Sequence, residues 1–128
     1  MENKELLEKA KEVSKSAYAK YSNFCVGACV EASSGKTYVG CNMENASYGL
    51  GICAERNAIA NAIANGEREL RKVAIYSPNS ELCFPCGACR QVIFEFQNKD
   101  YPIEVVLELK GEHVTYPIND LLPYGFVL

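Results

Sequence analysis

Three cysteines stand at a regular spacing in the segment ELCFPCGACRQV, residues 81–92, namely Cys83, Cys86 and Cys89. A thiolate at every third position is typical of a metal site, but the spacing suits more than one metal. An iron–sulfur cluster needs a fourth cysteine nearby and usually a following Cys-Pro pair, which this chain lacks. A zinc site needs only one CxxC pair plus ligands from elsewhere in the chain, so the pattern favours zinc.

The expected helix starts favour three particular thiols as the ligands. Cys53 is expected at the start of one helix, and Cys86 and Cys89 at the start of another. Free N–H groups and the helix dipole stabilise a thiolate at such positions. Cys83 precedes Pro85 and lies outside the helix. We therefore predict one zinc ion per chain, bound by Cys53, Cys86 and Cys89, with a structural site that recruits Cys83 as the alternative.

A zinc ion with three protein ligands keeps an open fourth position, which is the mark of a catalytic site. Glu55 is expected in the first turn of the helix that begins at Cys53, where its carboxylate can reach a metal-bound water and act as base and acid. The alternative is a glutamate that only opposes the helix dipole. Three thiolates leave the site net negative, so Arg56 is the expected balancing cation, unless it lies on a solvated helix face.

The hydrophobic pattern predicts the elements that position these residues. Helical spacing is found over residues 3–19, from Cys53 to a cap at Gly66, and from Pro85 to Phe96. Strands are expected at residues 24–32, 37–42, 71–77, 102–109 and 113–117. The third and fourth strands, joined by a helix, should be parallel, whereas the short KGE turn makes the last two antiparallel. The predicted fold is α/β, a mixed five-stranded sheet flanked by helices.

Composition excludes several classes of protein. With 128 residues, 48% of them hydrophobic and 23% charged, the chain is expected to form a single domain over residues 1–128. A net charge of -3 argues against a nucleic-acid partner, and the charged N-terminal segment is neither a signal peptide nor a membrane span. Seven cysteines without an export signal indicate a reducing, cytoplasmic location, with Cys25, Cys29 and Cys41 as core residues.

The segments CAE at 53–55 and PCGAC at 85–89 resemble the zinc-dependent cytidine deaminases. The resemblance covers nearly the whole chain, through YSNFCVGA, GCNMENASYGLGICAERNAI, FPCGACRQV and LLP. A cysteine at position 53, where many relatives carry histidine, is typical of the small homotetrameric type that acts on free nucleosides. The resemblance implies a three-layer fold and the hydrolysis of cytidine and deoxycytidine to uridine, deoxyuridine and ammonia in pyrimidine salvage. It also implies a homotetramer with shared active sites.

The resemblance further implies roles for residues around the metal. Asn42 and Glu44 are expected to hydrogen-bond the ribose hydroxyls. Phe24 and Phe126 are expected to pack against the pyrimidine and its pocket. Tyr48 and its loop should approach the site of a neighbouring subunit.

The expected mechanism makes Glu55 a proton shuttle between a zinc-bound hydroxide, N3 of cytosine and the leaving amine. In the family the backbone around Ala54 and Cys86 helps to orient this base, and the arginine that matches Arg56 hydrogen-bonds the zinc thiolates. The ending LLPYGFVL also resembles blasticidin S deaminase, although NME at 42–44 keeps the ribose-binding pair. A blasticidin S deaminase-like aminohydrolase is therefore one alternative. A non-catalytic, zinc-stabilised binding module is a second, independent alternative.

Overall fold

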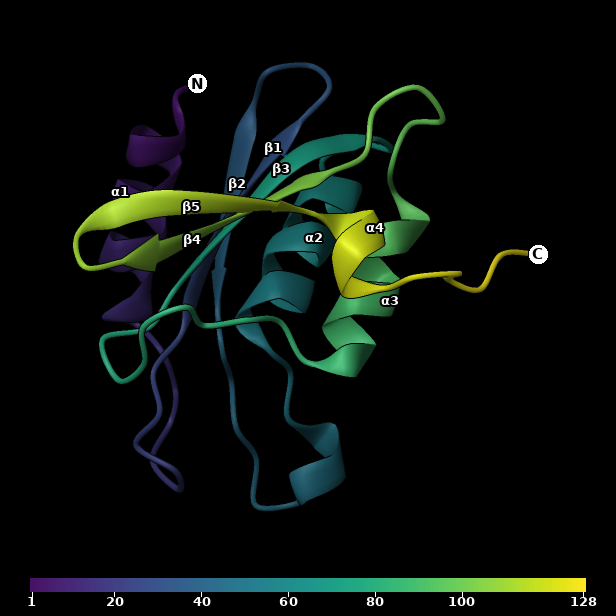
Figure 1. Cartoon of the computed structure of the whole chain (residues 1–128). Coiled ribbons are helices and arrows are strands. Elements are labelled where there is room, and N and C mark those ends of the chain that lie inside the picture. The colour runs from purple at the N-terminus through teal and green to yellow at the C-terminus, as the bar shows by residue number, and fades with distance from the viewer.

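A computed structural model describes all residues, 1–128, around a mixed sheet in the order β2-β1-β3-β4-β5 (Figure 1). The strands are β1 (Gly27–Ala32), β2 (Thr37–Cys41), β3 (Leu70–Tyr76), β4 (Glu104–Leu109) and β5 (Glu112–Pro117). β3 and β4 pair in parallel, and β1–β2, β1–β3 and β4–β5 are antiparallel pairs. The α/β fold is therefore confirmed, including the parallel crossover and the antiparallel last pair.

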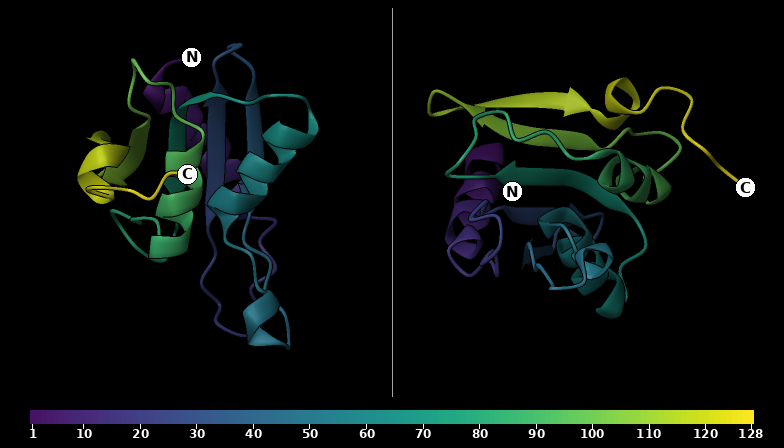
Figure 2. Two further views of the ribbon diagram at one scale, coloured as in Figure 1. Left: turned by 90° about the vertical axis from the view of Figure 1, so that its right-hand side faces the viewer. Right: turned by 90° about the horizontal axis from the view of Figure 1, so that it is seen from below.

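Helices cover both faces of the sheet and make a three-layer molecule (Figure 2). They are α1 (Asn3–Ser14), α2 (Ala54–Ala64), α3 (Gly87–Glu95) and α4 (Ile118–Leu121), with a short 3₁₀ helix η1 (Tyr48–Leu50). α1 lies on one face with a small core that includes Leu6, Ala74 and Val106. α2 and α3 lie on the other face over a core of 16 buried residues. Because both faces are covered, the central strand β3 has an apolar centre, as predicted.

The first helix ends at Ser14, which is five residues earlier than predicted. Beyond it, the Tyr18 N–H donates to the Asn42 carbonyl at 2.9 Å, and the Glu44 N–H donates to the Tyr18 carbonyl at 2.8 Å. These non-local bonds give the backbone N–H and carbonyl groups of Tyr18 hydrogen-bond partners outside a helix. The alanines in this segment favour a helix, but pairing with residues 42–44 outweighs that local preference.

The first strand begins at Gly27, so the predicted strand start at Phe24 is wrong. The Asn42 side chain takes the place of a strand partner here, because its Oδ1 accepts from the Val26 N–H at 2.9 Å. Its Nδ2 donates to the Phe24 carbonyl at 2.8 Å. Phe24 therefore lies in a loop that a side chain holds in place, and 39% of its surface is exposed.

Helix α2 lies directly against β2 because Gly40 has no side chain. A Cβ at Gly40 would stand 2.3 Å from the Ala58 nitrogen and 2.8 Å from the Ala54 oxygen. The helix ends at Ala64, and the φ of +94° at Gly66 allows the predicted cap just beyond it. The close approach at its other end fixes the position of Cys53, the N-cap residue of α2.

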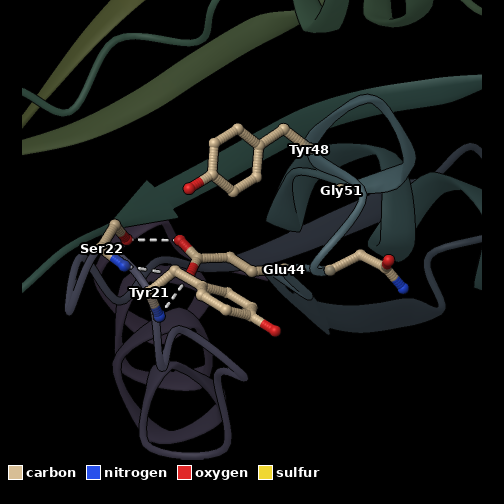
Figure 3. Close-up of a pocket in the computed structure, with 6 residues that line it drawn as sticks. Tyr21, Ser22, Glu44, Tyr48 and Gly51 are labelled. Atoms are coloured by element: carbon tan, nitrogen blue, oxygen red, sulfur yellow. Dashed lines mark hydrogen bonds between the residues drawn. The ribbon is translucent and has the colours of Figure 1, made fainter.

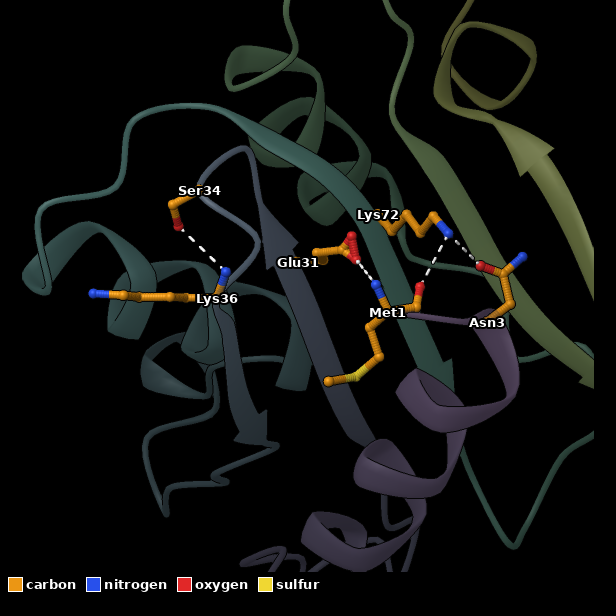
Figure 4. A network of polar contacts seen from close by, with 6 residues as sticks. All are labelled: Met1, Asn3, Glu31, Ser34, Lys36 and Lys72. Carbon is orange, nitrogen blue, oxygen red and sulfur yellow. Dashed lines mark hydrogen bonds and ion pairs between the residues drawn. The ribbon is translucent and has the colours of Figure 1, made fainter.

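Polar contacts attach the start of α1 to the sheet (Figure 4). The amino group of Met1 pairs with the buried Glu31 carboxylate of β1 at 3.2 Å. Lys72 of β3 donates to the Met1 carbonyl at 3.3 Å and to Asn3 Oδ1 at 2.9 Å. These bonds hold α1 across the two central strands.

Candidate active site

The starts of α2 and α3 bring three thiols together, as the sequence predicted. Cys53 and Cys86 are the N-cap residues of the two helices, and Cys89 is buried in the first turn of α3. Their Sγ atoms all lie within 4.8 Å of one another, and those of Cys53 and Cys86 are 3.9 Å apart. Tetrahedral zinc with bonds of about 2.3 Å holds its sulfurs about 3.8 Å apart. The donor set and its spacing therefore fit zinc.

Two of these thiols, Cys53 and Cys89, have pKa values shifted in opposite directions. Hydrogen bonding from Cys89, assisted by Arg56, lowers the pKa of Cys53 to about 5. The same bond to Cys53, together with burial, raises the pKa of Cys89. Cys89 therefore has to lose its proton when a metal ion binds, because the thiolate is the form that acts as a ligand.

Cys83 lies outside this group, as predicted. It is half-buried against the main core, and burial raises the pKa of its thiol to about 11. Its sulfur does not belong to the group of three that lie within 4.8 Å of one another. This position argues against the alternative site with four cysteines.

Arg56 lies beside the sulfur cluster and not on a solvated face. Its Nη2 donates to the Cys53 Sγ at 3.5 Å. This hydrogen bond raises the pKa of Arg56 and keeps the guanidinium charged. The Arg56 Nε is buried without a hydrogen-bond partner, so the side chain is held here at some cost in free energy. Its position fits the predicted charge-balancing role.

Glu55 is almost completely buried in the first turn of α2, with 4% of its surface exposed. Burial raises the pKa of its carboxyl to about 7, and the nearby Cys53 sulfur acts in the same direction. A carboxylate that serves only the helix dipole stays solvated and needs no such burial. A group with a pKa near neutrality can both accept and donate a proton, which is what the predicted role requires.

A cavity of about 340 Å³ opens among the loops that precede α2, and neither Glu55 nor any of the three cysteines lines it (Figure 3). It is lined by Tyr21, Ser22, Glu44, Asn45, Tyr48 and Gly51. The Glu44 carboxylate accepts hydrogen bonds from the Tyr21 N–H at 3.0 Å, the Ser22 N–H at 3.1 Å and the Ser22 hydroxyl. The bond from Ser22 is the main reason why the pKa of Glu44 is lowered. Glu44 is thus ionised and oriented in the cavity wall.

Sequence reasoning missed Tyr21 and Ser22 as residues of this cavity. The block YSNFCVGA contains them, but no spacing rule connects them with a glutamate 22 and 23 residues later. Only the pairing of Tyr18 with Met43 brings the two segments side by side.

Met43 connects the predicted ribose-binding pair to the metal ligands. Its N–H and carbonyl both bond Ile52 at 2.9 Å, directly before Cys53. Asn42 and Glu44 therefore flank a residue that pairs with the segment entering α2. In this structure, however, the amide of Asn42 is used to hold the loop at residues 24–26.

Two of the predicted aromatic contacts, Tyr48 and Phe126, are largely exposed. The exposed fraction is 84% for Tyr48, whose ring meets Tyr21 edge to face at 6.4 Å. It is 67% for Phe126, which lines a separate hollow at the end of α3. Neither side chain folds back into the core of its own chain.

A buried glutamate beside three cysteines, all at the starts of two helices on one face of a mixed sheet, defines a zinc-dependent hydrolase of the deaminase class. Residues 1–105 match the family described as "Cytidine and deoxycytidylate deaminase zinc-binding region". The chain therefore belongs to the cytidine deaminase family, and Cys53, Cys86 and Cys89 bind its zinc ion.

Curated relatives and solved structures agree with this assignment. The chain is 39% identical to the cytidine deaminase of Sporosarcina psychrophila, over 98% of this chain and 92% of that one. It is 36% identical to that of Halalkalibacterium halodurans, over 98% and 95%. The crystal structure of cytidine deaminase from Burkholderia pseudomallei superposes with a TM-score of 0.90 at 43% identity, covering 98% and 100%.

The helices of this chain are all too short or too polar to span a lipid bilayer. The longest, α1, has 12 residues.

Proposed function

We propose that this chain hydrolyses cytidine and deoxycytidine to uridine and deoxyuridine and releases ammonia. The observation that carries the proposal is the buried Glu55 beside a three-cysteine zinc site. The relatives that match over nearly the whole chain are cytidine deaminases. A zinc-stabilised binding module has no use for a carboxyl buried beside an open metal position, since that burial costs stability.

The chemistry follows from the position of Glu55. When bound, zinc supplies a Lewis acid that lowers the pKa of a water molecule. Glu55 takes the proton of the attacking water and delivers it to N3 of cytosine, which makes C4 more electrophilic. The oxygen then bonds to C4. Glu55 takes the remaining proton of this oxygen and carries it to the amino group at C4, so the C4 carbonyl forms as the C–N bond breaks and ammonia leaves.

The remaining residues hold the substrate and the charge. Asn42 and Glu44 bind the ribose hydroxyls, and Glu44 is already ionised in a cavity wall. Phe24 packs on the pyrimidine. The backbone at Ala54 and Cys86 orients the base. Arg56 offsets the negative charge of the thiolates, from a position 3.5 Å from one of them.

Phe126 and Tyr48 are assigned to shared sites in a homotetramer. Both side chains are largely exposed in the single chain, which supports a role at a neighbour's surface. The seven cysteines form no disulfide and suit a reducing compartment such as the cytoplasm.

The direct test is an ammonia assay on zinc-loaded protein with cytidine, deoxycytidine, cytosine and blasticidin S. We expect turnover of the two nucleosides and little on the free base. Turnover of blasticidin S alone would assign the chain to the sister branch. Bound zinc with no turnover of any compound would favour a binding module.

A further inference from the structure

Arg90 has no role in the proposed chemistry, yet its side chain contacts the metal-binding turn. It lies in the second turn of α3, directly after Cys89. A cation near a helix start is unfavourable for the helix dipole, so a compensating interaction is expected. Arg90 is half-buried and makes two hydrogen bonds to carbonyl oxygens in different parts of the chain.

The first bond fixes the peptide that leads into Cys86. The Arg90 Nε donates to the Pro85 carbonyl at 2.7 Å. Because a trans peptide is planar, the direction of the Pro85 carbonyl also sets the direction of the Cys86 N–H. That N–H donates to no group of the chain and is free to meet a ligand. Arg90 therefore orients the backbone of the metal ligand Cys86 through the preceding peptide group.

The second bond reaches the C-terminal segment. The Arg90 Nη1 donates to the carbonyl of Leu121, the last residue of α4, at 2.9 Å. That carbonyl lies at a helix end, where intrahelical partners are missing. One residue further along α3, Gln91 donates to the Phe126 carbonyl at 3.1 Å. The segment after α4 thus contacts α3 at Arg90 and Gln91, and the C-terminal tail runs across this helix in Figure 1.

One aromatic ring, that of Phe84, lies against the guanidinium, and a second ring supports Phe84. The ring of Phe84 lies 6.0 Å from the Arg90 guanidinium carbon. Phe84 itself packs edge to face on Tyr116 of β5, with ring centroids 5.1 Å apart. A planar guanidinium can stack on a ring while it bonds two carbonyls in different directions, but a lysine ammonium cannot reproduce this.

We propose that Arg90 is a positioning residue that holds the Cys86 turn and the C-terminal segment from Leu121 to Leu128 in one fixed arrangement. The inference rests on the proposed function, because this arrangement sets the metal-binding turn and Phe126 relative to each other. The bonds of Arg90 run to the backbone on both sides, so loss of the guanidinium loosens both segments together.

The test compares Arg90→Lys with Arg71→Lys, a matched change at an exposed arginine of β3. The chain contains no tryptophan, so Phe126→Trp gives a single fluorescent reporter in the C-terminal segment. Arg90→Lys in that background should lower its anisotropy and speed zinc release to a chelator. We expect zinc content to stay near one per chain and kcat/KM for cytidine to fall about tenfold, as for loss of one charged hydrogen bond. Arg71→Lys should change none of these.

A double-mutant comparison of Arg90 and Phe126 distinguishes a positioning role of Arg90 from a general effect on the stability of the fold. If Arg90 acts by placing Phe126, then Arg90→Lys combined with Phe126→Ala should cost less in kcat/KM than the sum of the two single losses. Additive losses, or a change in only one of the tail and zinc-release measurements, would overturn the proposal.

Two further controls keep the result decisive. If Arg90→Lys does not fold, Phe84→Leu removes the stacked ring and leaves both hydrogen bonds, and it should loosen both segments to a smaller extent. Fluorescence and zinc release need no turnover, so they remain readable if the parent protein deaminates no nucleoside. That last outcome would refute the proposed function and not the role of Arg90.

Discussion

Cys83 differs from the three zinc ligands in its position, although it stands at the same spacing. The sulfurs of Cys53, Cys86 and Cys89 lie within 4.8 Å of one another, whereas Cys83 lies before α3 and outside this group. Cys83→Ser should therefore keep about one zinc per chain and most of the activity, and Cys86→Ser or Cys89→Ser should lose both. Zinc content by elemental analysis checks this. Loss of zinc from the Cys83 variant would revive a structural site with four cysteines.

Glu55 is the residue on which the proposed chemistry depends most. Glu55→Gln keeps the shape and removes the proton shuttle, so turnover should fall by at least about 10²- to 10⁴-fold. Zinc content and folding should be unchanged, because the carboxylate is not among the three ligands. Steady-state kinetics on zinc-matched samples measures the effect. A variant that keeps more than a tenth of the rate would leave Glu55 as a helix-dipole residue.

Glu44 holds the turn at residues 21–22 and is also the proposed ribose contact. Glu44→Gln keeps one carbonyl acceptor but removes the charge. The value of kcat/KM for cytidine should therefore fall, by an amount that corresponds to a loss of about 1–3 kcal/mol of binding free energy. Any residual activity on free cytosine should hardly change. Ser22→Ala is the control, since it removes one bond to Glu44 and leaves the carboxylate. Equal losses on cytidine and cytosine would mean that Glu44 acts through the fold.

At the scale of elements, the contact between β2 and α2 sets the position of the site. Gly40→Ala would force the two backbones apart, because its Cβ would stand 2.3 Å from the Ala58 nitrogen. Such overpacking costs about 1–3 kcal/mol, and zinc should bind more weakly because Cys53 begins α2. Urea unfolding with and without a chelator measures both effects. Gly49→Ala, whose added Cβ meets nothing within 4 Å, should leave both unchanged; a stable, zinc-tight Gly40 variant would contradict this account.

At the scale of the whole molecule, the open question is which chain's site Phe126 completes. Glu55→Ala and Phe126→Ala proteins, each weak alone, can be unfolded together, refolded with zinc and assayed. If Phe126 acts on a neighbour, some mixed assemblies contain a site with both residues intact, and activity exceeds that of either parent. The 67% exposure of Phe126 in the single chain favours this result.

A different result is expected if Phe126 completes the site of its own chain. Every site of a mixed assembly would then carry one lesion, and activity would equal the average of the parents. Subunit exchange, confirmed by mass, is the necessary control for this reading.

The sequence alone determined the metal and its ligands. Helix starts are local features, and their free N–H groups favour a thiolate over a thiol wherever the helix lies. Cys53, Cys86 and Cys89 could therefore be selected, and Cys83 rejected, without coordinates. The parallel crossover and the antiparallel last pair also followed from the chain, because connection length restricts strand direction.

The tertiary structure decided what depends on contacts between distant segments. Pairing of Tyr18 with Met43 ended the first helix early and placed Ser22 against Glu44. The hydrogen bond of Arg90 to Leu121 joins residues 31 positions apart, which no periodicity encodes. Backbone hydrogen bonds and side-chain caps across the fold carry no local signature, since any residue offers the same N–H and carbonyl groups. For that reason the sequence predicted the zinc ligands, and only the structure showed what holds them in place.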